Sequence, residues 1–232
     1  MLFTLFFLHP SLIFASQQDI VIQNDYLSAK WTVEKETFKP KSFWNKKIQP
    51  NVEILPIESS EEFILSYYDK DEKQISLIKS SSLTFDKVED IQNQKRISFK
   101  SYQHNEITFD IIEVIELPEG QSHFEKYLEI KCSSSSVTIH SIEFNNYIYS
   151  KDDIAKTCSY YEDNSILSTF GHPFYTNTFY TGSFSQNSRG SIEKSTGQTR
   201  IQLSVQKKFE SGTFISEKVF FGVDSEPLYN RI

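Results

Sequence analysis

The stretch that decides the fold reads Glu106-Ile-Thr-Phe-Asp-Ile-Ile-Glu-Val-Ile-Glu-Leu117, then Pro118-Glu-Gly120, then His123-Phe-Glu-Lys-Tyr-Leu-Glu-Ile-Lys-Cys132. In the first half of the first run, apolar residues alternate with polar ones, as in a strand with one buried face. Ile112 and Val114 then break that alternation, which is typical of a strand that becomes buried on both faces. The proline and glycine between the runs indicate a reversal of the chain. The sequence therefore predicts an antiparallel hairpin.

Similar segments occupy most of the chain on both sides of this hairpin. The composition also favours strands, because the 232 residues include twenty Phe and twelve Tyr, and bulky rings suit a pleated, half-buried surface. Only the short segment 150–163 has a helical pattern. We therefore predict one all-β domain, an antiparallel sandwich of two packed layers. The further expected strands are Asp19–Gln23, Tyr26–Val33, Val52–Ile57, Glu62–Tyr67, Gln74–Ile78, Ser82–Val88, Arg96–Tyr102, Val137–Tyr149, Thr199–Val205 and Thr213–Val223.

The N-terminus has the pattern of an export signal. Leu2–Leu8 and Leu12–Ala15 are almost wholly apolar, and small residues precede the polar pair Gln17-Gln18. This run is too short to span a bilayer, so we expect a cleaved signal peptide over residues 1–16 rather than stable membrane insertion. The alternative is a buried first strand. A signal would make the mature protein secreted or periplasmic.

The net charge of −7 argues against a nucleic-acid partner, whose phosphates require a basic face. We interpret the basic cluster Lys39, Lys41, Lys46 and Lys47 as a solvated turn.

Export would permit a disulfide between Cys132 and Cys158, although two reduced and buried thiols fit the sequence equally well. Neither the cysteine spacing nor any other pattern predicts a metal site or a cofactor.

The segment Phe170–Ser188 is unusually rich in aromatic residues. Exposed rings can stack on the apolar face of a sugar while nearby amides bind its hydroxyls. The alternatives are that the rings fill the gap between the sheets, or that they dock against another domain. The candidates for carbohydrate binding or domain docking are His172, Phe174, Tyr175, Asn177, Phe179 and Tyr180, with Trp44 as a second location.

No catalytic residue follows from the sequence. Glycoside hydrolysis needs two carboxyl groups on opposite sides of the scissile bond, but the carboxylates of this chain lie in polar, turn-like runs or within strands. We expect Glu113 and Glu116 to be cross-strand partners of lysines. Among the histidines, only His172 has surroundings that suggest a site, and a structural hydrogen bond would explain it as well.

Four landmarks resemble, in order, those of one glycosidase module. Their shared order is more specific than any one motif, and together they extend over most of residues 19–223. They are Asn24-Asp-Tyr-Leu-Ser-Ala-Lys-Trp31; Ile115-Glu-Leu-Pro-Glu-Gly120 with Phe124-Glu-Lys-Tyr-Leu-Glu-Ile130; Phe170-Gly-His-Pro-Phe-Tyr175 with Thr178-Phe-Tyr-Thr-Gly182; and Ser216-Glu-Lys-Val-Phe-Phe-Gly-Val223.

The chain is thus similar to the N-terminal, galactose-mutarotase-like β-supersandwich of α-galactosidase-type and related glycoside hydrolases. The resemblance implies either a non-catalytic domain over residues 17–223 that packs against a (β/α)8 catalytic barrel, with residues 224–232 starting the linker to it, or a truncated or split enzyme. One departure is Ser183-Phe184-Ser185-Gln186, where the family usually has an acidic residue and a proline. A stand-alone carbohydrate-binding protein and an aldose 1-epimerase-like enzyme are the alternatives.

Overall fold

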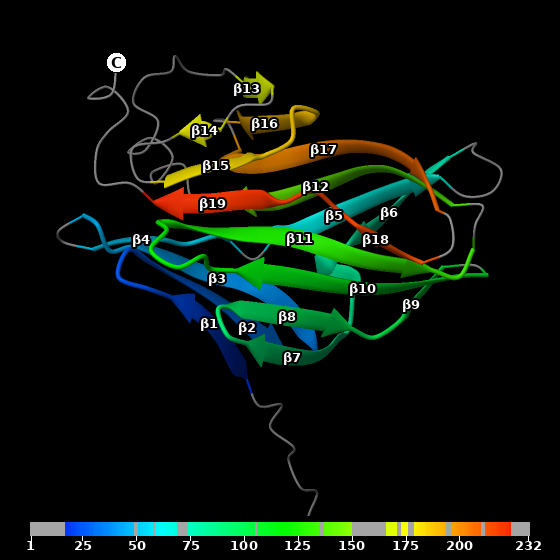
Figure 1. Cartoon of the computed structure of the whole chain (residues 1–232), viewed down its shortest axis with the longest axis horizontal. Helices are drawn as coiled ribbons and strands as arrows, with labels where there is room; N and C mark the ends of the chain where they lie inside the picture. The colour runs from blue at the N-terminus through cyan, green and yellow to red at the C-terminus, as the bar shows by residue number, and fades with distance from the viewer. Residues whose placement is uncertain are drawn as a thin grey trace, which may run out of the picture.

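The structure is a computed structural model. It describes residues 17–48, 51–57, 59–68, 74–104, 106–134, 137–149, 166–170, 173–175, 179–193, 196–209 and 212–223. These residues form antiparallel strands in three sheets (Figure 1), together with one 3-10 turn, η1 (Ser80–Ser82). They contain no helix that is long and apolar enough to cross a membrane. The predicted all-β sandwich is confirmed, while the predicted export signal, the helix-like segment 150–163 and residues 224–232 lie outside the described residues.

A nine-stranded sheet forms one layer and lies nearest the viewer in Figure 1. Its strands follow the order β14-β15-β19-β11-β10-β8-β7, with β9 beside β10 and β18 beside β11. The bounds are β7 (Phe85–Ile91), β8 (Gln94–Phe99), β9 (Tyr102–His104), β10 (Ile107–Glu116), β11 (His123–Cys132), β14 (Phe174–Tyr175), β15 (Phe179–Ser183), β18 (Thr213–Ile215) and β19 (Val219–Val223).

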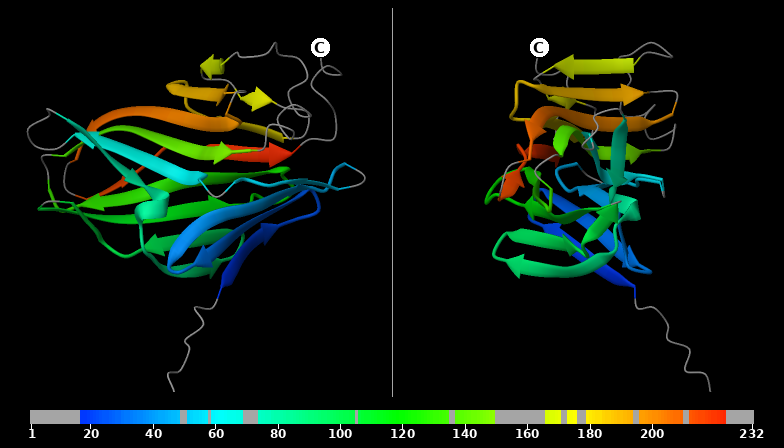
Figure 2. Two further views of the ribbon diagram at one scale, coloured as in Figure 1. Left: turned by 180° about the vertical axis from the view of Figure 1, so that it is seen from behind. Right: turned by 90° about the vertical axis from the view of Figure 1, so that its right-hand side faces the viewer.

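Two smaller sheets pack against the inner face of this layer, as the views from behind and from the side show (Figure 2). The four-stranded sheet follows the order β1-β2-β3-β4, and the six-stranded sheet follows β13-β16-β17-β12-β5-β6. Their bounds are β1 (Gln18–Gln23), β2 (Leu27–Glu34), β3 (Thr37–Asn45), β4 (Val52–Ile54), β5 (Glu61–Tyr68), β6 (Ile75–Lys79), β12 (Thr138–Ile148), β13 (Ile166–Phe170), β16 (Ser188–Glu193) and β17 (Gln198–Lys208).

The predicted hairpin is confirmed as β10 and β11, the centre of the nine-stranded sheet. The two strands pair in register over eight positions, including Glu113 opposite Leu128 and Ile115 opposite Lys126. Gly120 in the turn has φ of 69°, a left-handed conformation that glycine adopts at little cost.

Three sequence interpretations were wrong. The expected single strand Arg96–Tyr102 is divided, because β8 ends at Phe99 and β9 begins at Tyr102. Lys39 and Lys41 lie within strand β3 rather than in a turn, because the strand buries Phe38 and Phe43. The expected single strand Thr213–Val223 is divided into β18 and β19. The break falls at Ser216. Its backbone N–H donates to the carbonyl of Leu128, and its hydroxyl accepts a hydrogen bond from the backbone N–H of Leu128.

Aromatic rings from all three sheets fill the core. Trp31 of β2 lies 5.6 Å from Phe124 of β11, and Phe43 of β3 lies 5.2 Å from Tyr147 of β12, measured between ring centroids. Phe221 of β19 stacks on Phe124 at an interplanar angle of 20°. Because the first two contacts join different sheets, burial of these rings holds the layers together, while the Phe221–Phe124 stack lies within the nine-stranded sheet.

A charged network lies within this apolar core. The Lys126 ammonium is 2.6 Å from Glu62 Oε2 and 2.8 Å from the Tyr147 hydroxyl, and it lies 3.5 Å from Glu113 Oε1. Trp31 Nε1 donates to Glu62 Oε1 at 2.8 Å. The network links the three sheets, and the charged side chains of Lys126, Glu62 and Glu113 are fully buried.

The charges in this network are unevenly matched. Burial raises the pKa of Glu113 to about 8, Lys126 acts against this shift, and the negative charge of Glu62 acts with it. Near neutral pH, Glu113 is therefore largely protonated, which leaves the carboxylate of Glu62, 2.6 Å away, as the ion-pair partner of Lys126. This arrangement avoids an unpaired buried charge, which would cost several kcal/mol.

Candidate functional site

The outer face of the nine-stranded sheet carries a row of polar and aromatic side chains. Strand β11 alternates, because Phe124, Lys126, Leu128 and Ile130 are buried on the inner side. The residues between them point outward, since successive side chains of a strand face opposite sides. The outward residues are His123, Glu125, Tyr127 and Glu129.

Glu116, Glu125 and Lys218 form what we call the carboxylate cluster. The Lys218 ammonium donates to Glu125 Oε2 at 2.8 Å and also to Glu116 Oε2. Although partial burial lowers the pKa of Lys218, its hydrogen bonds to the two carboxylates raise the pKa further and hold it above the ordinary value. Lys218 therefore remains a cation shared by two carboxylates at any physiological pH.

Neighbouring side chains orient this cluster. Gln94 Nε2 donates to Glu116 Oε1, and the Tyr127 hydroxyl donates to the same oxygen at 3.4 Å. The Lys218 ammonium lies 5.5 Å from the centre of the Tyr127 ring, a cation–π contact. The cluster is thus held in place by side chains from two strands, β8 and β11.

An aromatic platform, which we define as Phe184, Phe220, Tyr180 and His123, lies beside the cluster. Phe184 is 62% exposed and lies 5.0 Å from Phe220, which is only 7% exposed. The rings of Tyr180 and His123 pack on Phe220 at 6.0 and 5.8 Å. The backbone N–H of Phe184 donates to the carbonyl of Lys218, so the platform adjoins the carboxylate cluster directly.

Two glycines let the platform lie close to the sheet. A Cβ on Gly222 would lie 2.3 Å from Tyr180 Cζ, and a Cβ on Gly182 would lie 2.8 Å from Phe220 Cζ. Any side chain at these positions would lift the rings away from the strands. The Tyr180 hydroxyl is further held by the Ser122 hydroxyl at 3.2 Å.

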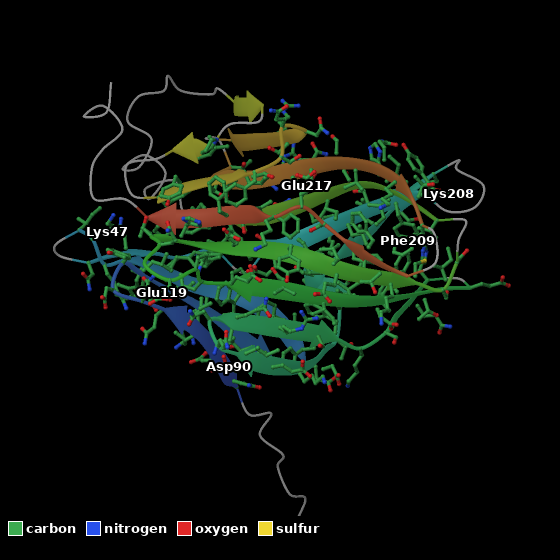
Figure 3. All side chains as sticks on the ribbon, in the orientation of Figure 1. Lys47, Asp90, Glu119, Lys208, Phe209 and Glu217 are labelled. Carbon is green, nitrogen blue, oxygen red and sulfur yellow. The ribbon has the colours of Figure 1, made fainter. Side chains whose placement is uncertain are left out.

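The carboxylate cluster borders an open hollow of about 440 Å³. Figure 3 labels two neighbours of its lining residues, Glu119 in the β10–β11 turn and Glu217, which precedes Lys218. The size suits a small ligand, since such sites typically measure several hundred Å³. The lining residues are Ile91, Gln92, Asn93, Gln94, Glu116, Leu117, Pro118, Glu125 and Lys218.

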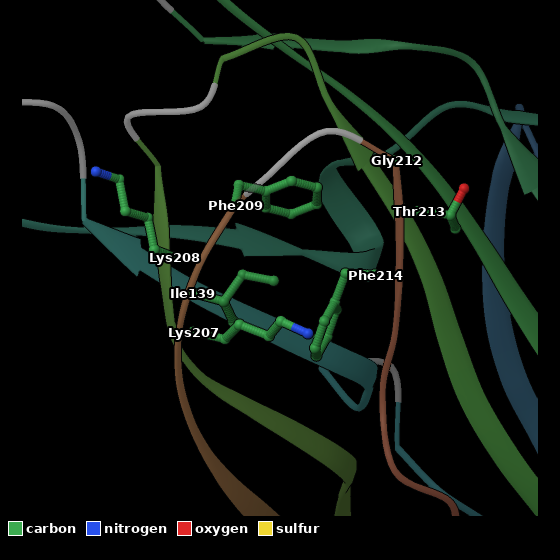
Figure 4. A pocket seen from close by; sticks show the side chains of 7 residues that line it. All are labelled: Ile139, Lys207, Lys208, Phe209, Gly212, Thr213 and Phe214. Atoms are coloured by element: carbon green, nitrogen blue, oxygen red, sulfur yellow. The ribbon is translucent and has the colours of Figure 1, made fainter.

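Another hollow, shown in Figure 4, measures only about 100 Å³. It lies where β12, β17 and β18 meet, and the Lys207 ammonium sits 5.6 Å from the centre of the Phe214 ring. This volume is too small for a sugar ring. A third hollow of about 270 Å³, between β17 and β18, has no carboxylate cluster of this kind and only Glu217 as an acidic residue.

Phe179 and Tyr180, two of the residues predicted from the aromatic segment, face opposite sides of the sheet. Phe179 is 2% exposed and stacks on Phe221 at 5.1 Å, so this ring belongs to the core. Tyr180 is half-buried on the outer face. Phe174 and Tyr175 form β14, with their backbone paired to β15. Positions 172 and 177 lie outside the described residues.

The remaining sequence candidates lie elsewhere. Trp44 is half-buried on β3, in the four-stranded sheet, so the structure does not bring it to the outer-face site. Cys132 ends β11 and is half-buried, and burial raises the pKa of its thiol. Position 158 lies outside the described residues. Glu113 and Glu116 each have a lysine nearby, Lys126 at 3.5 Å and Lys218. Lys126 lies on the neighbouring strand β11, as expected of a cross-strand neighbour, whereas Lys218 lies before β19 and is not on a strand paired with β10.

Sequence reasoning missed most of the outer-face site. The signal for part of it was present, because one parity of His123–Cys132 carries histidine, glutamate, tyrosine and glutamate in succession. The convergence of Gln94, Glu116 and Lys218 depends on strand register, which no local pattern reveals. Among the residues that the structure describes, no cluster of histidine, cysteine and acidic side chains could hold a metal ion. In comparisons with known proteins, no family model matches the chain and no curated protein matches its sequence.

Proposed function

We propose that this protein is a carbohydrate-binding β-sandwich module of an exported carbohydrate-active protein, without catalytic activity of its own. The observation that carries the proposal is that the exposed Phe184 ring packs on Phe220, the register partner of Glu125, while the Phe184 backbone N–H donates to the carbonyl of Lys218. An aromatic ring can stack on the apolar face of a pyranose. Carboxylates and amides placed at its edge can bind the sugar hydroxyls.

The resemblance to the galactose-mutarotase-like domain supports a sugar as the ligand. In this proposal the β-sandwich is of that subtype and accompanies a (β/α)8 glycoside hydrolase barrel. Phe184 lies in the Ser183–Gln186 stretch, where the family usually has an acidic residue, and Glu125 from β11 lines the adjoining hollow. The apolar N-terminal run supports export.

Isothermal titration with galacto-oligosaccharides tests the proposal. We expect weak, saturable binding by the full chain and a loss of roughly tenfold in affinity, about 1.4 kcal/mol, for Phe184→Ala. Leu77→Ala is the matched control, because Leu77 is 54% exposed on the edge strand of the six-stranded sheet. Absence of heat with every glycan would contradict carbohydrate binding and would favour docking of a catalytic domain on this face.

A second candidate is aldose 1-epimerase activity, because His123 and Glu125 lie side by side on the outer face. His123 Nε2 is 3.6 Å from Glu125 Oε1, and its Nδ1 is 3.5 Å from the Tyr180 hydroxyl. Anomer exchange needs an acid and a base near the ring oxygen and the anomeric hydroxyl. Polarimetry of α-galactose with the wild type and with His123→Ala tests it, and equal rates would exclude His123 as the catalyst.

A further inference from the structure

The carboxylate cluster holds more negative than positive charge. Glu116 and Glu125 share one cation, Lys218. Arg96 of β8, another cation of this face, is committed to Glu129, which it contacts through both terminal nitrogens at 2.8 and 2.7 Å. Such a bidentate pair presents almost no net charge to a ligand, because the guanidinium and the carboxylate offset each other. The hollow therefore presents a surplus carboxylate.

Glu125 provides an oxygen with acceptor capacity to spare. Its Oε2 accepts from Lys218, whereas its Oε1 lies 3.6 Å from His123 Nε2, a separation longer than a hydrogen bond. The side chain is 14% exposed and lines the hollow. A donor on a bound sugar could reach this oxygen without displacing Lys218.

We infer that the outer-face site selects amino sugars, and that Glu125 is the residue that determines this selectivity. The inference rests on the proposed carbohydrate binding. An ammonium group on the pyranose donates to Glu125 Oε1 and offsets the surplus charge, whereas the carboxylate of a uronate is repelled. Two charges about 4 Å apart in a water-like medium change affinity roughly fivefold. Affinity should therefore decrease from the amino sugar to the neutral sugar to the uronate.

Methyl glycosides of galactose, galactosamine and galacturonic acid form a matched test set, because they share one ring and differ in charge. Binding to the full chain is measured by NMR titration at roughly 10 mM ionic strength, where screening is weak. The variant Glu125→Gln keeps the shape and removes the charge. Asp19→Asn is the control with the same change in net charge, because Asp19 pairs with Lys30 and Lys41 on the four-stranded sheet.

We expect the galactosamine glycoside to bind roughly fivefold more tightly than the galactose glycoside, and the galacturonate glycoside to bind more weakly than either. Glu125→Gln should remove this order of affinities, whereas Asp19→Asn should retain it. Equal affinities, tighter binding of galacturonate, or an order that survives in Glu125→Gln would overturn the inference and leave carbohydrate binding standing. If none of the three sugars binds, both the proposed function and the inference fail.

Discussion

The ammonium of Lys126 on β11 lies 2.6 Å from the carboxylate of Glu62 on β5, and neither side chain is exposed to solvent. The contact joins the nine-stranded sheet to the six-stranded sheet, and the indole of Trp31 attaches the four-stranded sheet to the same carboxylate. This pair fixes how the layers meet, because each charge is satisfied only when the sheets are correctly placed. The outer-face site depends indirectly on this ion pair, because Lys126 lies between Glu125 and Tyr127 on β11 and points to the opposite side of the sheet.

Removal of one partner should be costly. Lys126→Met leaves Glu62 as a buried carboxylate without its cation, and we expect a loss of about 3–5 kcal/mol in the free energy of unfolding. Urea denaturation followed by tryptophan fluorescence measures this. Lys79→Met, at an exposed lysine on β6, is the control. A loss below about 1 kcal/mol for Lys126→Met would contradict the role of the pair.

The buried Glu113 should make stability depend on pH. The unfolded chain releases this proton near the ordinary pKa of 4.5, whereas the folded chain retains it up to about 8. Between these values only the folded state binds the proton, so the contribution of Glu113 to stability falls as pH rises. The slope is about 1.4 kcal/mol per pH unit, and the loss is complete above the folded pKa.

Glu113→Gln isolates this effect. From about pH 5 to about pH 8, the unfolding free energy of the variant should rise relative to that of the wild type. Above about pH 8 the difference between them should level off. Glu106→Gln, at an exposed position before β10, should show no such trend. A difference between Glu113→Gln and wild type that stays constant with pH would show that Glu113 titrates normally in the folded protein.

The contact between Gly222 and Tyr180 should be sensitive to a single methyl group. Gly222→Ala places a Cβ 2.3 Å from Tyr180 Cζ, so the ring must move, and we expect a loss of about 1–3 kcal/mol. Tyr180→Ala in the same chain should relieve the clash. The two changes should therefore be strongly non-additive in a double-mutant cycle of unfolding free energies, whereas additive losses would mean that the ring does not rest on Gly222.

The sequence predicted the β10–β11 hairpin well, because its periodicity and its turn are local properties. The same alternation placed Lys126 among Phe124, Leu128 and Ile130, and a lysine in a buried row is unusual enough to indicate a hidden partner. That partner could not be identified, because Glu62 lies 64 residues away in the chain and meets Lys126 only when two sheets pack.

The candidate site was less accessible to sequence reasoning. Of the aromatic candidates, Tyr180 lies on the outer face, but Phe179 points into the core because neighbouring strand positions face opposite sides. Phe184 was not among the predicted site residues, because the sequence does not show that its ring is exposed beside Phe220. Lys218 and Glu116 lie 102 residues apart in the chain, so only the pairing of β19 and β10 with β11 brings them together.

The most direct test of the central claim, that the outer face of the nine-stranded sheet binds carbohydrate, is backbone-amide NMR of the full chain during titration with methyl galactosaminide. We expect saturable shifts that cluster at Phe184, Glu125 and Lys218; in Phe184→Ala the remaining shifts should need roughly tenfold more ligand, and Leu77→Ala should titrate like the wild type. Unchanged spectra, or shifts confined to the small hollow around Lys207 and Phe214, would contradict this claim.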